Sequence, residues 1–114
     1  MSSANKSAID WDLIGQYRSL LGATGLADSV AMLQRVMPQY IDELQTHVAS
    51  QNEKATRAQA HKMKGSCRSL GLNRVGLVME WLEKESWQWS DVEETLATWP
   101  ALFEQDCKAL VSGL

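Results

Sequence analysis

The chain has 114 residues, 45% of them hydrophobic, which is enough for one buried core and too few for two domains. No apolar run reaches the roughly 20 residues that a membrane-spanning helix needs, and the first residues lack the apolar stretch of a secretory signal. We therefore expect a cytoplasmic protein with a flexible tail at residues 1–8 and a single domain over residues 9–114.

The net charge of −3 conceals an uneven distribution of charge. Six basic residues and no acidic ones lie in the window from Lys54 to Arg74, so every acidic residue lies outside it. A basic patch on an otherwise acidic chain indicates a local contact with an acidic partner surface, rather than binding along the length of a polyanion.

The first predicted helix is short and ends at glycines. Ser7 or Asp10 can cap it, and its apolar residues share one side as far as about Leu21. Gly22 and Gly25 are then expected to end it.

A second helix is predicted over about residues 27–49. It carries apolar residues at spacings of three and four, as one face of a long bundle helix requires: Val30, Leu33, Met37, Ile41, Leu44 and Val48. Pro38 lies inside it and should bend it, because proline removes a backbone donor and crowds the preceding turn.

The third and fourth predicted helices form a hairpin. Ser50 and Glu53 have the spacing of a capping box that begins the third helix, and Gly71 is a suitable residue just after its end. Asn73 can cap the fourth helix. The turn between them is so short that the two helices should be antiparallel neighbours.

A fifth helix follows a connection at residues 87–89. Ser90 and Glu93 have capping-box spacing, and apolar residues continue at helical intervals through Pro100, where we expect a kink or a brief break. The sequence shows no strand-like alternation. It predicts an all-α fold, an antiparallel four-helix bundle of the second to fifth helices with the short N-terminal helix packed across one end.

The third helix carries the chemical signature of the chain. His61 lies off its apolar stripe, which is formed by Thr56, Ala60, Met63, Cys67 and Leu70. Gly65 follows one turn later on the same outer face, although a glycine inside a helix costs roughly 1 kcal/mol relative to alanine. Lys62 and Lys64 flank the histidine with positive charge, which suits a phosphoryl group or a carboxylate. We infer that a partner comes close to His61 at Gly65.

The stretch from His61 to Ser66, followed by Leu70-Gly71-Leu72, resembles the signature of histidine-containing phosphotransfer (HPt) domains. Met37-Pro38-x-Tyr40 resembles the C-terminal HPt domains of tripartite sensor kinases of the aerobic-respiration and trimethylamine-oxide type. The resemblance implies a phosphohistidine intermediate that takes a phosphoryl group from a receiver-domain aspartate and passes it to another receiver. It fits both a free-standing transfer protein and the cytoplasmic C-terminal part of a membrane-anchored sensor kinase.

The resemblance also assigns expected roles to residues around His61, the phosphoacceptor. Lys64 would steady the phosphoryl oxygens and Gly65 would clear space for the receiver. Further basic residues would contribute receiver-docking charges: Lys62, Arg68 and Arg57. No cofactor is expected on this chain, since Mg²⁺ and the acceptor aspartate would belong to the partner receiver domain, and the chain should act as a monomer without catalysis of its own.

A histidine imidazole is largely neutral at about pH 7, so one ring nitrogen is available as a nucleophile without a general base. A group on the fourth helix that accepts the Nδ1–H bond would leave Nε2 free to attack. Glu83 and Glu80 are both candidates for this group. Glu83 matches a position at which the aerobic-respiration-type domains carry glutamine, which is a departure from the family pattern.

Other function classes fit less well. An autonomous hydrolase lacks an acidic partner, because no Asp or Glu follows Glu53 on the histidine's helix. A metal site built from His61 with Cys67, His47 or Glu83 would need side chains from different helix faces, and we expect Cys67 and Cys107 to be buried free thiols. A helix-turn-helix nucleic-acid module is disfavoured by the overall acidity. A helical protein-interaction adaptor without phosphotransfer remains the alternative.

Overall fold

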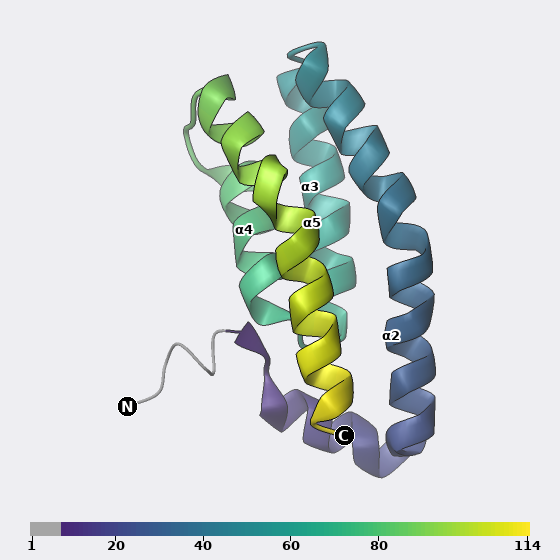
Figure 1. Ribbon diagram of the computed structural model, residues 1–114. Helices are drawn as coiled ribbons and strands as arrows, with labels where there is room; N and C mark the ends of the chain where they lie inside the picture. Colours follow the sequence, from purple (N-terminus) through teal and green to yellow (C-terminus); the bar gives the residue numbers. More distant parts are fainter. Residues whose placement is uncertain (1–7) are drawn as a thin grey trace.

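The computed structural model describes residues 8–114, and its helices are α2 (Trp11–Ala49), α3 (Glu53–Ser69), α4 (Asn73–Lys84) and α5 (Trp89–Ser112). No strand occurs in this range, so the predicted all-α class is confirmed. Figure 1 shows the helices side by side, with the start of α2 turning across the end of the bundle near the C-terminus.

The helices pack as an antiparallel bundle. α3 and α4 form the closest pair, as their short connection predicts, while α2 lies against both α3 and α5 and α4 also contacts α5. None of the helices in the described range is both long and apolar enough to cross a membrane.

The predicted boundary between the first two helices was partly wrong. Asp10 caps the first segment through its side chain, which accepts a hydrogen bond from the N–H of Leu13, whereas Ser7 lies outside the described residues. Gly22 alone breaks the helical backbone, with φ 74° and ψ 168°, a conformation that glycine adopts without steric cost. Gly25 lies inside the helix, so the long helix begins directly after Gly22 and not at residue 27.

Two predicted caps lie elsewhere in the structure. Asn52, not Ser50, caps α3 by accepting a hydrogen bond from the N–H of Ala55 at 3.1 Å. Gln51, which takes a φ of 52°, turns the chain between α2 and α3, so the cap shifts past Ser50. The cap position of α4 is Leu72 without a side-chain bond, because Gly71, at φ 72°, already turns the chain and makes Asn73 the first helical residue.

The fifth helix starts earlier than predicted. The N–H of Gln88 donates to the carboxylate of Asp91, so α5 begins at Trp89 and the predicted box at Ser90 was two residues late. α5 continues through Pro100, so the brief break that we considered there does not occur. α2 likewise continues through Pro38.

The apolar stripes of the helices meet in one core. Trp99 and Phe103 of α5 stack at 5.4 Å between ring centroids, and the indole N–H of Trp99 donates to the carbonyl of Val75 on α4. Cys67 and Cys107 are buried free thiols, as predicted, and burial raises the pKa of each to about 12.

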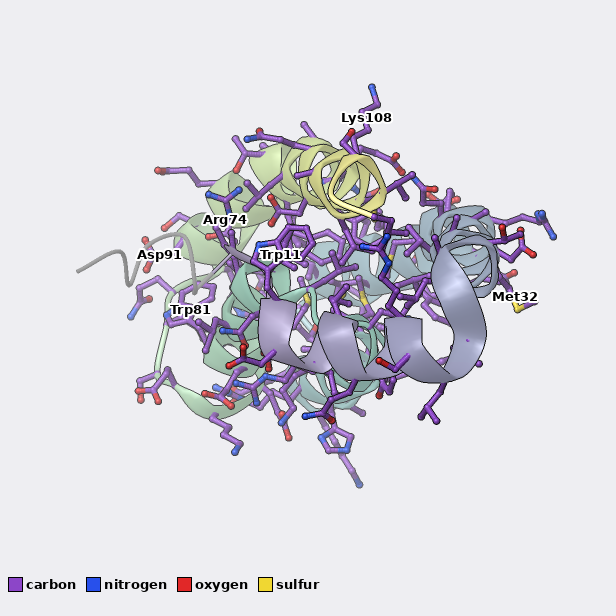
Figure 2. All side chains as sticks on the ribbon, turned by 90° about the horizontal axis from the view of Figure 1, so that it is seen from below. Trp11, Met32, Arg74, Trp81, Asp91 and Lys108 are labelled. Carbon is purple, nitrogen blue, oxygen red and sulfur yellow. The ribbon has the colours of Figure 1, made fainter. Side chains whose placement is uncertain are left out.

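Seen from the end that carries the N-terminal segment, Trp11 lies over the end of the bundle (Figure 2). A Cβ atom built at Gly113 would run into its ring, so the two ends of the domain meet there. Met32 and Lys108 point outward from α2 and α5 in the same view.

Candidate functional site

His61 stands on the outer face of α3. Its side chain is 67% exposed, while Ala60 and Met63 on either side are fully buried. The apolar stripe therefore turns toward the core and presents the imidazole to solvent, which confirms the outward placement predicted from the sequence.

Glu83 of α4 holds the ring. Nδ1 of His61 lies 2.9 Å from Oε2 of Glu83, a contact that the α3–α4 hairpin creates between residues 22 positions apart. An ionised carboxylate only accepts hydrogen bonds, so Nδ1 must be the donor. Nε2 is then the ring nitrogen with a free lone pair.

Lys64 binds the same carboxylate. Its Nζ lies 2.6 Å from Oε1 of Glu83, and its side chain is only 13% exposed. The hydrogen bond from Lys64, together with the weaker effect of His61, holds the pKa of Glu83 below its ordinary value of 4.5, although partial burial opposes the shift. Glu83 is therefore ionised at neutral pH. The expected contact between Lys64 and a phosphoryl group stays a prediction.

Gly65 leaves open space beside the histidine. A Cβ atom built there would meet no atom within 4 Å, so no internal contact explains a glycine at this helical position. The Nζ atom of Lys62, next to His61, lies 4.2 Å from the ring centroid of Tyr40 on α2. Lys62 and Tyr40 both belong to the surface around the imidazole of His61.

Glu80 does not reach the histidine. Its Oε1 is 3.0 Å from Nη1 of Arg68, and the Arg68 stem packs over Gly76 of α4. Of the two glutamates considered from the sequence, the structure therefore places Glu83 at the ring and Glu80 one turn away.

Arg57 turns toward the end of α4. Its guanidinium donates to the carbonyls of Leu82 and Glu83 and lies 4.5 Å from the centroid of the Trp87 ring. It also pairs with Glu53 at 2.9 Å. These contacts satisfy carbonyls that a helix end leaves unpaired.

The sequence reasoning missed an open groove between α2 and α3. Its lining includes Met32, Val36 and Tyr40 of α2, Ser66 of α3 and Leu70, which directly follows α3. Met32, Val36 and Tyr40 recur at intervals of four, a second apolar row beside the core stripe of α2 that could have indicated the groove. Met32 is 62% exposed, so this row forms an apolar surface next to the histidine helix.

The metal alternative finds little support in the geometry. Cys67 is fully buried, whereas His61 faces solvent, so the two do not share a site. No group of three His, Cys, Asp or Glu side chains within residues 8–114 is arranged to hold a metal ion.

Comparison with known proteins identifies the family of this chain and its site. A sequence profile of the Hpt domain family matches residues 28–112, a segment that contains the histidine, its lysines and the glutamate that binds them. The chain belongs to the Hpt domain family.

Individual relatives agree with the assignment to this family. The chain is 26% identical over 116 aligned residues to the aerobic respiration control sensor protein ArcB of Escherichia coli O157:H7 and of Escherichia coli strain K12. The match covers 88% of this chain and 15% of each sensor protein. Among solved structures, the histidine-containing phosphotransfer domain of ArcB from Escherichia coli matches with a TM-score of 0.78 and 25% identity, covering 96% of this chain and 98% of that chain.

These findings confirm two predictions from the sequence. The fold is the helical bundle of an Hpt domain, and the function is that of a phosphohistidine intermediate in two-component signalling, with receiver domains as its partners. The roles of the individual site residues depend on the geometry described above.

Proposed function

We propose that His61 is the phosphoacceptor of this Hpt domain and that Nε2 carries the phosphoryl group between receiver-domain aspartates. The observation that supports this assignment is the 2.9 Å contact between Nδ1 and Glu83, which leaves Nε2 as the free nucleophile on an exposed ring. His47, the other histidine, lies near the end of α2 outside the motif.

The receiver docks on the face formed by α2 and α3 around the ring. Gly65 leaves the close approach open, and the groove beside it offers the apolar row of Met32, Val36 and Tyr40. Lys62, over Tyr40, adds positive charge on this face, and Arg68 adds positive charge on the α4 side of α3; both suit the acidic site of a receiver.

Mg²⁺ belongs to the partner receiver in this proposal. Glu83, the carboxylate at the ring, already binds both Lys64 and His61, so its oxygens are not free to bind a cation. The chain acts as a monomer, because a second copy on the α2–α3 face would cover the docking surface. It meets its receivers in the cytoplasm, without membrane or nucleic-acid contact of its own.

Transfer from a labelled, phosphorylated receiver domain in the presence of Mg²⁺ tests the proposal. The recipients are the wild type, His61→Gln and the matched control His47→Gln. We expect label on the wild type and on His47→Gln, lost in acid and retained in base, and none on His61→Gln. Equal label on His61→Gln would refute the assignment, and no label on any recipient with several receivers would favour the adaptor alternative.

A further inference from the structure

A second apolar groove, the α2–α5 groove, runs between α2 and α5. α5 packs on α2 and α4 and lies in front of the histidine helix α3 in Figure 1. Gln45 lines both of the hollows that make up this groove, so they are continuous. Because the lining extends from Met37 to Ala49 along α2, the groove is about 18 Å long, or about three helical turns. Its floor consists of buried or half-buried apolar side chains: Met37, Ile41, Val48, Leu96 and Phe103.

Two prolines line the α2–α5 groove from opposite walls, Pro38 of α2 and Pro100 of α5. A proline has no N–H, so each removes the helical hydrogen bond to the carbonyl four residues earlier, which belongs to Gln34 or Leu96. Residues four apart lie on the same face of a helix, so these carbonyls lie beside the prolines. The groove therefore offers main-chain acceptors as well as apolar contact.

Three exposed carboxylates stand at the edges of the α2–α5 groove, those of Asp42, Glu93 and Glu104, and no lysine or arginine lines it. None of the three forms an ion pair within residues 8–114. Glu104 accepts a hydrogen bond from the neutral amide of Gln34 at 2.8 Å. Lys108, one turn beyond Glu104, points outward from α5 (Figure 2). The edges of the groove are therefore negatively charged.

The charges of α3 and α5 are opposite in sign. α3 carries five basic residues and one acidic residue, whereas α5 carries five acidic residues and one basic residue. The basic helix suits the acidic site of a receiver, and the acidic helix would repel the same partner. Nucleic acids and anionic membranes are disfavoured at the groove for the same reason. The occupant that fits has one apolar side and positive charge beside it.

We propose that the α2–α5 groove binds an amphipathic helix of a partner protein, whose apolar row enters the groove and whose lysine or arginine residues meet Asp42, Glu93 and Glu104. Such a helix docks through residues at positions i, i+3, i+4 and i+7, which span about two turns and fit the length of the groove. Its basic side chains can also donate to the carbonyls beside the prolines. The proposal does not depend on phosphorylation of His61, because this groove and the α2–α3 docking face have different linings.

Titration of ¹⁵N-labelled protein with two synthetic helices, followed by NMR, tests the proposal. One peptide has a leucine row at the spacing given above, flanked by lysines, and the control peptide has glutamate in place of every lysine. We expect saturable binding of the lysine peptide, with amide shift changes at Ile41, Gln45 and Ala97 and a lower affinity at higher salt. The glutamate peptide should not bind. Shift changes centred elsewhere, or no saturable binding of the lysine peptide, would overturn the proposal.

A groove-filling variant separates docking in the groove from contact elsewhere on α5. Ala97 lines the groove at an exposed position, so Ala97→Phe should fold and should weaken binding of the lysine peptide at least about tenfold. Ala109→Phe, exposed on the same helix outside the lining, should leave the affinity unchanged. Equal affinities of the two variants would overturn the proposal.

A charge variant separates the edges of the groove from the general acidity of the chain. Asp42→Asn/Glu93→Gln should weaken binding of the lysine peptide about fivefold or more. Glu85→Gln/Glu94→Gln removes the same charge from exposed positions outside the lining and should change the affinity less than about twofold. Equal losses in the two double variants would show that the attraction is not specific to the groove.

Two further measurements distinguish this proposal from the proposed function and from another occupant. His61→Gln should bind the lysine peptide as tightly as the wild type does, and saturating peptide should leave transfer from a receiver to the wild type unchanged. A peptide that blocks transfer would instead occupy the α2–α3 face. Sedimentation should show monomers for the wild type and for Ala97→Phe. A wild-type dimer that Ala97→Phe dissociates would assign the groove to a second copy and overturn the proposal.

Discussion

Lys64 and Glu83 form an ion pair of 2.6 Å that joins α3 to α4 beside the exposed ring of His61. The side chains are 13% and 20% exposed, so the pair is largely shielded from solvent. It anchors one carboxylate oxygen and so turns the other toward Nδ1. Lys64, on the same helix as His61, thus orients the histidine ring indirectly, through Glu83 on the neighbouring helix α4.

The ion pair makes the free energy of unfolding depend on pH in the acidic range. Because Lys64 lowers the pKa of Glu83 below 4.5, the folded state binds this proton more weakly than the unfolded state does. The contribution of Glu83 to stability is therefore complete above the unfolded value and is lost as the pH falls through the lowered folded value. Urea unfolding at about pH 7 and about pH 3 should show a larger loss of unfolding free energy for the wild type than for Glu83→Gln. Glu94→Gln, on an exposed position of α5, serves as the control, and equal losses in all three proteins would contradict the account.

Substitutions at Gly65 should separate folding from docking. Gly65→Ala meets open space, so it should raise the free energy of unfolding by up to about 1 kcal/mol through helix propensity. Gly65→Gln should fold as well and yet reduce transfer from a receiver at least about tenfold, because its side chain fills the approach to His61. Gly15→Ala, also without neighbours, is the control that alters stability alone. Full transfer to Gly65→Gln would show that the receiver does not approach there.

Arg57 should matter for stability more than for transfer. Its hydrogen bonds to the last carbonyls of α4 and its position over Trp87 predict that Arg57→Ala lowers the unfolding free energy by about 2 kcal/mol. Lys54→Ala, exposed on the same helix, should change it little. A transfer rate that falls while stability is unchanged would instead support the docking role that the sequence suggested.

Arg74 and Asp106 join α4 to α5 through a bidentate ion pair in which the aspartate side chain is only 2% exposed. Arg74→Met leaves a buried carboxylate without its partner and should lower the unfolding free energy by about 3 kcal/mol. The double variant Arg74→Met/Asp106→Leu removes both charges and should recover much of this loss. Thermal or urea unfolding measures both, and a double variant no more stable than Arg74→Met would contradict this explanation.

Much of the fold could be predicted because the apolar spacing on each helix is regular. The stripe through Ala60, Met63 and Cys67 identified the buried face of α3 and, by exclusion, the exposed face of His61. Helix caps were harder to predict. Ser50 and Asn52 are both good capping residues, and the choice between them depends on the positive φ of Gln51, which depends on how the chain turns between two packed helices.

The site was predictable where its residues share one helix. His61, Lys62 and Gly65 are placed by helical spacing alone, whereas the choice of Glu83 over Glu80 depends on the register of α4 against α3. That register is set by core packing and by contacts such as the Arg68 stem over Gly76. The pair of Arg74 with Asp106 also lies beyond local patterns, because it joins residues 32 positions apart.

The identity of the phosphorylated ring nitrogen is the most direct test of the central claim, because Glu83 occupies Nδ1 and leaves Nε2 free. The coupling between ¹⁵N and ³¹P in the phosphorylated, ring-labelled protein assigns that nitrogen. Our account predicts that phosphorus couples to Nε2 of His61. A phosphoryl group on Nδ1, or on any residue other than His61, would contradict it.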